Sequence, residues 1–378
     1  MTLQPPIYHP GLEGVFAGIS SICDVDPETG GLLYRGYSVE ELSLQATFEE
    51  LAYLLFIGRL PSRADLDAFL IHLSQNRALP GQLLTLFQLL PASTHPMDAL
   101  RSAISMLGCL DPTATDHSHE ANLRKAIRLT AIIPTIIAAY YKHVHDQPPI
   151  APDPQLSHCQ NFFRMLTGRV PDGFIIKAFN TSMILYAEHE FNASTFSARV
   201  TASTLSDFYS AITSAIGTLK GRLHGGANEQ VMRMLLEINR PESAVGWVQE
   251  ALGKKKRVPG FGHRVYKKGD SRALVIKRFS KELGERAGGT KWYEMSCIIE
   301  ETMRKEKDLY PNLDFYSAST FYLMDLPLEL YTPIFVMSRI TGWCAHVIEQ
   351  QDNNRLIRPR CAYNGPRGLK YVPADQRP

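Results

Sequence analysis

The sequence predicts an all-α fold with one short N-terminal β-hairpin. Three observations support this prediction: helix start signals recur along the chain, apolar residues return at helical spacing behind them, and strands do not alternate with helices. The 378 residues, of which 44% are hydrophobic and 21% charged, supply enough apolar material for a large core. A chain of this length is expected to form two domains.

The hairpin is predicted close to the N-terminus. Residues 19–25 and 32–37 are runs of β-forming side chains, and residues 26–31 between them are rich in turn formers. These are nearly the only strand signals in the chain, so helices are expected from there on.

Capping boxes mark the starts of the first two amphipathic helices. Thr47 with Glu50 precedes one leucine-rich segment, and Ser62 with Asp65 precedes the next. Pro96, which suits a first helical position, starts a third helix.

The most apolar run, residues 129–141, is predicted to be a buried core helix although it contains Pro134. It is too short to cross a bilayer, which takes about 20 residues. After residue 228 the chain becomes more polar and basic, and apolar helix returns at residue 327. We therefore expect a large domain from residues 1–225 and 327–378, and a small domain from residues 226–326.

Composition excludes several classes of function. The formal net charge of +2, from 40 basic and 38 acidic residues, gives no argument for nucleic-acid or membrane binding. Six cysteines without CxxC spacing and an N-terminus without a secretory pattern fit a cytoplasmic protein with reduced thiols. Histidine pairs at 117–119 and 143–145 have no third ligand of matching spacing, so no metal is expected.

Three stretches carry unusual chemistry. The first, residues 221–228, places His224 beside two glycines at a break between helices. Unpaired N–H groups at a helix start disfavour the imidazolium, which leaves a neutral ring able to donate one hydrogen bond. The alternative is a glycine-rich turn in which the histidine only caps the helix.

The second stretch, residues 259–266, places His263 directly after Gly262 and close to Gly260, and it follows the basic run 254–257. Glycines there would let the backbone meet a ligand, and the basic side chains would face phosphates. The alternative is a solvated basic surface.

The third stretch, residues 311–318, sets Asp314 among apolar and aromatic residues. Burial of this kind raises the pKa of a carboxylate and makes it a stronger base. The alternative is that Asp314 caps a helix.

Arginines form a fourth group. Arg339 lies in an apolar helix, where a guanidinium needs a carboxylate partner, and its forked geometry suits bidentate recognition of one. Arg272 and Arg358 lie in unlike settings, and His189 is a polar ring in an aromatic context. An internal ion pair is the alternative for Arg339.

Together, the three stretches resemble the three catalytic signatures of the citrate synthase family in order and spacing. Residues 185–196, 332–350 and 90–98 are most similar to those of bacterial 2-methylcitrate synthases. The resemblance implies an almost entirely helical homodimer, with a large domain, a smaller mobile domain and an active site between them.

The resemblance also implies roles. Asp314 would remove the α-proton of an acyl thioester, His224 would donate a hydrogen bond to the thioester oxygen, and His263 would polarise the ketone of oxaloacetate. Oxaloacetate would be bound by His189, Arg272 and Arg339, with Arg358 reaching in from the other subunit. The residues expected to bind coenzyme A are Arg257, Val258, Pro259, Gly260, Phe261 and Lys267.

The function expected from this resemblance is 2-methylcitrate synthesis from propionyl-CoA, oxaloacetate and water, with acetyl-CoA also accepted. Acyl-CoA is a co-substrate, and no permanently bound cofactor or metal is implied. Oxaloacetate is expected to bind first, and no inhibition by NADH is expected. The alternatives are a citrate synthase of the tricarboxylic acid cycle that prefers acetyl-CoA, and a non-catalytic CoA-binding helical scaffold.

Overall fold

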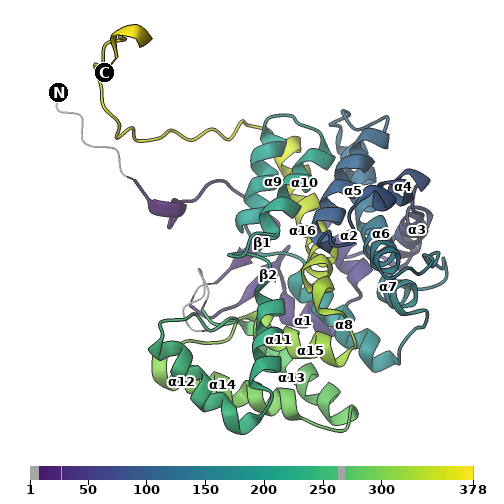
Figure 1. Ribbon diagram of the computed structural model, residues 1–378. Helices are drawn as coiled ribbons and strands as arrows, with labels where there is room; N and C mark the ends of the chain where they lie inside the picture. The colour runs from purple at the N-terminus through teal and green to yellow at the C-terminus, as the bar shows by residue number, and fades with distance from the viewer. Residues whose placement is uncertain (1–7, 27, 263–268, 378) are drawn as a thin grey trace.

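The computed structural model describes residues 8–26, 28–262 and 269–377, which form sixteen α-helices and three short strands (Figure 1). The predicted all-α fold with a short N-terminal hairpin is confirmed. The helices are α1 (Val39–Gln45), α2 (Phe48–Ile57), α3 (Arg63–Gln75), α4 (Gly81–Leu89), α5 (Pro96–Leu110), α6 (His119–Val144), α7 (His158–Thr167), α8 (Gly173–Tyr186), α9 (Ala193–Ser203), α10 (Phe208–Leu219), α11 (Ala227–Ile238), α12 (Ala244–Gly253), α13 (Ser271–Arg286), α14 (Lys291–Lys307), α15 (Leu313–Leu323) and α16 (Tyr331–Asp352).

The hairpin pairs β1 (Cys23–Val25) with β2 (Leu32–Tyr34) in antiparallel register, Cys23 opposite Tyr34. A third strand, β3 (Tyr37–Ser38), pairs with β2 and was not predicted. It is two residues long because Ser38 already caps α1, its side chain accepting the backbone N–H of Glu41.

The predicted helix starts are confirmed. Both capping boxes are present, Thr47 with Glu50 before α2 and Ser62 with Asp65 before α3. The apolar run 129–141 lies inside α6, most of it buried, and Pro134 sits within the helix. None of the helices in the described parts of the chain is long and apolar enough to cross a membrane.

The core is built around α16, whose side chains are buried along almost its whole length. It packs against α2, α6, α8, α9 and α10. A second group, α11 to α15, packs mainly within itself, and its members α13 and α15 also contact α8. This group covers the residues predicted to form the small domain, and its mobility stays a prediction.

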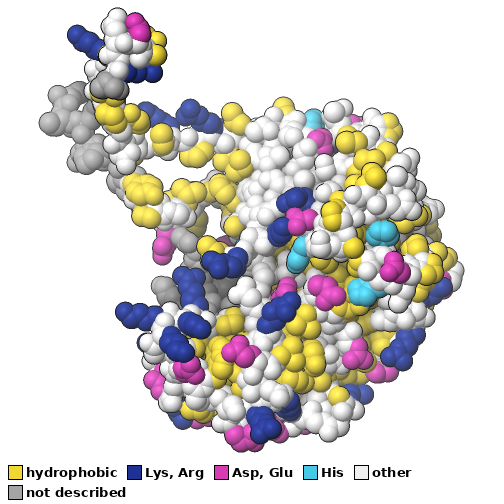
Figure 2. All heavy atoms as spheres, viewed as in Figure 1, with side chains coloured by type: hydrophobic (Ala, Val, Ile, Leu, Met, Phe, Trp, Pro, Cys, Tyr) yellow, Lys and Arg dark blue, Asp and Glu magenta, His cyan; other side chains and the backbone are white. Residues whose placement is uncertain are grey.

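Both ends of the described chain project from the helical body (Figure 1). They expose large hydrophobic side chains: Phe16 is 100% exposed, Ile19 94% and Tyr371 83%. Figure 2 shows hydrophobic side chains along both projecting segments. Such segments have no core of their own to bury these side chains against.

Candidate active site

The C-terminal end of α8 holds several elements together. The carbonyl oxygen of Leu185 accepts hydrogen bonds from the hydroxyl of Tyr34 on β2 and from Nη1 of Arg272 on α13, both at 3.3 Å. The carbonyl oxygen of Tyr186 accepts a hydrogen bond from Nε of Arg339 on α16 at 2.6 Å. The two arginines expected to bind oxaloacetate are thus anchored on neighbouring residues of one helix end.

Helix α16 touches the same end of α8 directly. The fully buried Glu188 accepts a hydrogen bond from Nε2 of His346 on α16 at 2.8 Å. At Gly342 the backbones approach so closely that a Cβ atom would lie 2.4 Å from the carbonyl oxygen of Ala187. Only glycine fits there.

Asp314 lies in the first turn of α15. It does not cap the helix, because the cap is Asn312, whose side chain accepts the backbone N–H of Asp314. Its Oδ1 accepts a hydrogen bond of 2.7 Å from the hydroxyl of Tyr186. The base candidate is therefore held by α8, on which the arginines are also anchored.

Burial raises the pKa of Asp314 to about 6. The hydrogen bond from Tyr186 and the charges of Arg272 and Arg339 lower the pKa, and Asp270 raises it. The predicted direction is confirmed. The aromatic side chain that bonds the carboxylate comes from α8 rather than from the sequence neighbours of Asp314.

His224 lies in the turn between α10 and α11, as predicted. It does not cap α11, because the N-cap position is Gly226. Its Nε2 faces Ser194, whose backbone N–H lies 3.2 Å away and whose Oγ lies 2.8 Å away. A backbone N–H can only donate, so Nε2 accepts and the neutral ring carries its proton on Nδ1.

The pKa of His224 is lowered, as the predicted neutral state requires, and two causes that were not predicted contribute to this. Burial, followed by the positive charge of Arg339, lowers the pKa of His224 to about 4. Because α11 begins only at Ala227, the helix start is not the main influence. Arg339 acts on the pKa of both His224 and Asp314, so both groups lie within its electrostatic reach.

Arg272 forms a two-point ion pair with Asp270, from Nε to Oδ1 and from Nη2 to Oδ2, both at 2.9 Å. Oδ2 of Asp270 also accepts the backbone N–H of Leu313, the first residue of α15, at 3.0 Å. Asp270 is only 4% exposed. It therefore fixes Arg272 relative to the helix that carries Asp314.

Arg339 is 2% exposed, and its guanidinium lies 4.7 Å from the ring centre of Phe335. The ion pair considered for it is not found, because no carboxylate of the described residues lies within ion-pair distance. Within the described chain only Nε is hydrogen-bonded, so the Nη groups keep their donors for an anion. His189, 7% exposed, follows three residues after Tyr186.

The segment expected to bind CoA lies beside α15. The carbonyl oxygen of Gly260 accepts the backbone N–H of Asn312 at 2.9 Å, and the rings of Phe261 and Phe315 are 4.6 Å apart. Gly260 has φ +81°, and a Cβ there would lie 2.8 Å from Phe315 and from Val231. Protein packing therefore requires glycine at this position, and the contact of Gly260 with CoA stays a prediction.

The remaining predicted site residues differ in their exposure to solvent, and two of them are not described by the structure. Arg257 is exposed, Val258 is buried and Pro259 is half-buried. His263 and Lys267 lie outside the described residues. Arg358 is exposed and lies six residues beyond the end of α16, and it forms no hydrogen bond or ion pair with another predicted site residue among the described parts of the chain.

Tyr186, Ser194 and Asp270 contact candidate site residues and were not predicted. Tyr186 and Ser194 fall inside the stretch 185–196 that carried the family resemblance, which was the available signal. Their contacts with Asp314 and His224 join distant parts of the chain, and sequence spacing does not reveal such contacts. No group of His, Cys, Asp or Glu side chains suited to a metal ion occurs within the described ranges.

Known proteins resemble this chain over nearly its full length. Residues 11–360 match the family described as citrate synthase, C-terminal domain. The chain is 48% identical to citrate synthase 2 of Bacillus subtilis, over 97% of this chain and 98% of that protein. It is 46% identical to a 2-methylcitrate synthase of Mycobacterium tuberculosis, over 96% of this chain and 92% of that protein.

A solved structure shares the whole fold. It is a citrate synthase from Thermoplasma acidophilum, described as a ternary complex with carboxymethyl coenzyme A and oxaloacetate. It matches with a TM-score of 0.92 at 34% identity, covering 97% of this chain and 99% of that one. The chain therefore belongs to the citrate synthase family and is an enzyme of the citrate or 2-methylcitrate synthase type.

Proposed function

We propose that the enzyme condenses propionyl-CoA with oxaloacetate and hydrolyses the product to 2-methylcitrate and CoA. The observation that carries the condensing step is the pair of hydrogen bonds that hold the two groups: the hydroxyl of Tyr186 donates to Asp314, and the backbone N–H of Ser194 donates to Nε2 of His224. With a pKa of about 6, Asp314 is mostly ionised at neutral pH. With a pKa of about 4, His224 is neutral. The site thus presents a carboxylate base together with a neutral hydrogen-bond donor.

In the first step Asp314 removes the α-proton of the acyl thioester. The thioester oxygen gains negative charge as the enol forms, and the Nδ1–H of His224 donates a hydrogen bond to it. An aspartate is too weak to deprotonate such a carbon unless the developing charge is stabilised at the same moment. Base and donor therefore act together.

In the second step the nucleophilic carbon attacks the ketone of oxaloacetate. The Nη groups of Arg339, with Arg272 and His189, hold the carboxylates, and His263 stabilises the new alkoxide. Water then hydrolyses the thioester, and this step makes the overall reaction irreversible. The CoA part is bound by residues 257–261 and by Lys267. The complex named in the Thermoplasma acidophilum structure, with a CoA derivative and oxaloacetate, supports these ligand classes.

The active form is a homodimer in which Arg358 completes the oxaloacetate site of the other subunit. The exposed hydrophobic side chains on the projecting ends, including Phe16 and Tyr371, support an intersubunit position for these segments. Sedimentation equilibrium at assay concentration tests this. A mass equal to one 42.4 kDa chain would contradict it.

The choice of acyl group is tested by kinetics. CoA release is followed with a thiol reagent at saturating oxaloacetate, and kcat/KM is compared for propionyl-CoA and acetyl-CoA. We expect a preference for propionyl-CoA. The acyl groups differ by one methyl group, which a pocket distinguishes by about 1–3 kcal/mol, so both should react.

The second candidate is citrate synthesis from acetyl-CoA, because the Bacillus subtilis relative is named a citrate synthase. A clear acetyl-CoA preference would establish it. Absence of CoA release with both thioesters would contradict the condensing activity and support the scaffold alternative.

A further inference from the structure

We propose that Tyr186 is a positioning residue for the base: its hydroxyl occupies one carboxylate oxygen of Asp314 and leaves the other to receive the substrate proton. This inference rests on the proposed role of Asp314. The sequence gives no role to Tyr186, and the family resemblance assigned it none.

The position of the Tyr186 side chain is fixed. The residue is 3% exposed, and its ring packs 4.6 Å from that of Phe335 and 6.3 Å from that of Phe321. Its hydroxyl donates to Oδ1 of Asp314 at 2.7 Å. No described residue donates a hydrogen bond to Oδ2, so this oxygen is the one left for the substrate.

Hydrogen bonds from two arginines also fix the backbone at Tyr186. Its carbonyl oxygen accepts Nε of Arg339 at 2.6 Å, and the carbonyl of the preceding Leu185 accepts Nη1 of Arg272. One residue thus contacts the base through its side chain and an oxaloacetate-binding arginine through its backbone. The orientation of the base is thereby tied to the oxaloacetate site.

Several charged groups face Asp314. Arg272 and Asp270 approach from the start of α13 and Arg339 from α16, and the uncharged hydroxyl of Tyr186 approaches from α8. The two arginines lower the pKa of Asp314, and Asp270 and burial raise it. Bound oxaloacetate would compensate the arginine charges with its carboxylates. The neutral hydroxyl of Tyr186 is then the group that continues to favour the ionised base.

The proton balance is simple. Asp314 accepts the α-proton of the thioester on Oδ2, while the hydroxyl of Tyr186 keeps its own proton and its bond to Oδ1. Burial and the neighbouring carboxylate raise the pKa of Tyr186 well above its ordinary value, so the phenol stays protonated throughout. Tyr186 transfers no proton and is not itself a base.

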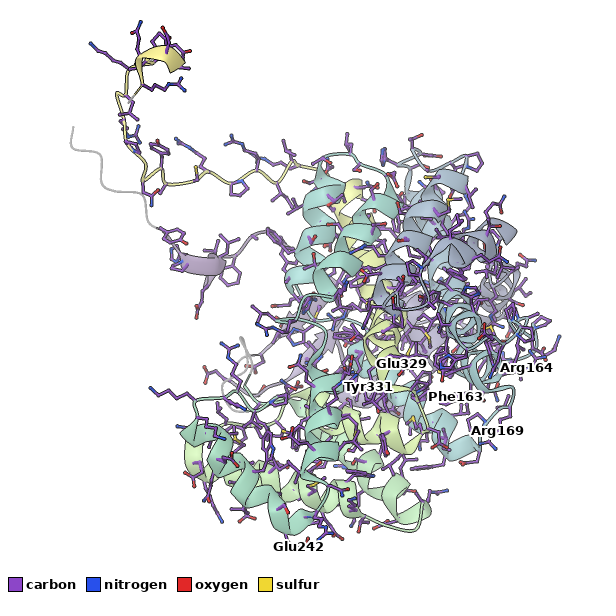
Figure 3. All side chains as sticks on the ribbon, in the orientation of Figure 1. Phe163, Arg164, Arg169, Glu242, Glu329 and Tyr331 are labelled. Atoms are coloured by element: carbon purple, nitrogen blue, oxygen red, sulfur yellow. The ribbon has the colours of Figure 1, made fainter. Side chains whose placement is uncertain are left out.

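The test compares Tyr186→Phe with the matched control Tyr331→Phe. Tyr331, labelled in Figure 3, is also fully buried and packs on Phe321, but its hydroxyl donates to the carbonyl oxygen of Ala318 at 3.2 Å. Each variant loses one buried hydroxyl from the same aromatic cluster. Only one of these hydroxyls contacts the base.

The measurement is kcat/KM for the acyl-CoA against pH at saturating oxaloacetate. Loss of the Tyr186 hydroxyl should raise the pKa of Asp314 and move the acid limb of the profile to higher pH by about one unit. At pH values below the acid limb, kcat/KM of Tyr186→Phe would be about tenfold lower than that of the parent enzyme. The limb of Tyr331→Phe should coincide with that of the parent.

Two results would overturn the inference: an acid limb that does not move in Tyr186→Phe, or one that moves equally far in Tyr331→Phe. Either result would leave Tyr186 with a packing role only. Asp314→Asn, assayed in parallel, separates the two hypotheses. If that variant keeps the parent rate, the proposed function fails. If it loses the rate while the limb of Tyr186→Phe stays in place, only the role of Tyr186 fails.

A second readout needs no turnover. Carbon-13 NMR of aspartate carboxyls in the ligand-free enzyme gives the pKa of Asp314 directly, with its signal identified by its absence in Asp314→Asn. A higher pKa in Tyr186→Phe is expected, and an unchanged one would contradict the inference.

Discussion

The turn that carries His224 and the first turn of α15, which carries Asp314, receive the same two influences with opposite results. Burial lowers the pKa of the histidine and raises that of the aspartate, whereas the charge of Arg339 lowers both. The two effects reinforce each other at His224 and oppose each other at Asp314. Both effects therefore favour the neutral form of His224. The ionised form of Asp314 is favoured only where the neighbouring groups that lower its pKa offset the effect of burial.

The largest effect is expected from Asp314→Asn. Removal of the base should lower kcat at least about 10²-fold, measured as CoA release at saturating substrates. The amide oxygen can still accept the hydrogen bond from Tyr186, so the local structure should be retained. A variant with the parent rate would rule out Asp314 as the base.

The free energy of unfolding of Asp314→Asn tests the raised pKa of Asp314 independently of activity. A pKa of about 6 in place of 3.8 means that the folded enzyme binds this proton more tightly than the unfolded chain. Stability is therefore lost as pH rises from about 3.8 to 6, and the loss persists above that range at about 3 kcal/mol. Asp314→Asn should unfold with a higher free energy than the parent at pH 7, and the difference should vanish near pH 3. A variant no more stable at pH 7 would contradict the raised pKa.

The next largest effect is expected from Arg339→Gln, which removes a charge that lowers the pKa of both His224 and Asp314. We expect KM for oxaloacetate to rise about 10- to 100-fold through loss of a charged hydrogen bond. The acid limb of kcat should move to higher pH as the pKa of Asp314 rises. Half-buried His224 should stay neutral at pH 7, so the alkaline side of the profile should not change.

Arg128→Gln is the matched control for that variant, since Arg128 pairs with Asp111 at 3.4 Å away from the site. It should leave both KM and the acid limb as in the parent. An acid limb of Arg339→Gln that coincides with the parent's would show that Arg339 does not influence the base.

The smallest effect is expected from Ser194→Ala. The backbone N–H that donates to His224 remains, and only the hydroxyl is lost, so kcat should fall by about tenfold or less. The acid limb should not move, because Asp314 is untouched. Ser280→Ala, which removes a buried hydroxyl bonded to Ser319, is the control. A displaced acid limb in Ser194→Ala would mean that the two turns are not independent.

Local signals were enough to predict the fold and parts of the site. The capping boxes at Thr47 and Ser62 involve residues three apart, so the sequence displays them directly. Residue type and setting made His224, Asp314 and Arg339 candidates, and their functional roles stay predictions. Sequence did not identify what holds them, because those contacts join distant segments.

Three features of the candidate site could not be predicted from the sequence. Tyr186 reaches Asp314 across 128 residues, and Ser194 reaches His224 across 30. Asp270 joins Arg272 to the start of α15, which is 43 residues away. The role proposed for Arg358 involves a second subunit, which the fold of one chain does not provide.

Gly342 has a consequence for attempts to stabilise the enzyme. A glycine inside a helix costs about 1 kcal/mol relative to alanine, so replacing helical glycines is a common engineering step. At this position the added methyl group would push α16 away from the end of α8. Arg339 on α16 would then lose its register with the carbonyl of Tyr186. The contact between α16 and the end of α8, which holds Arg339 against the carbonyl of Tyr186, thus requires that position 342 has no side chain.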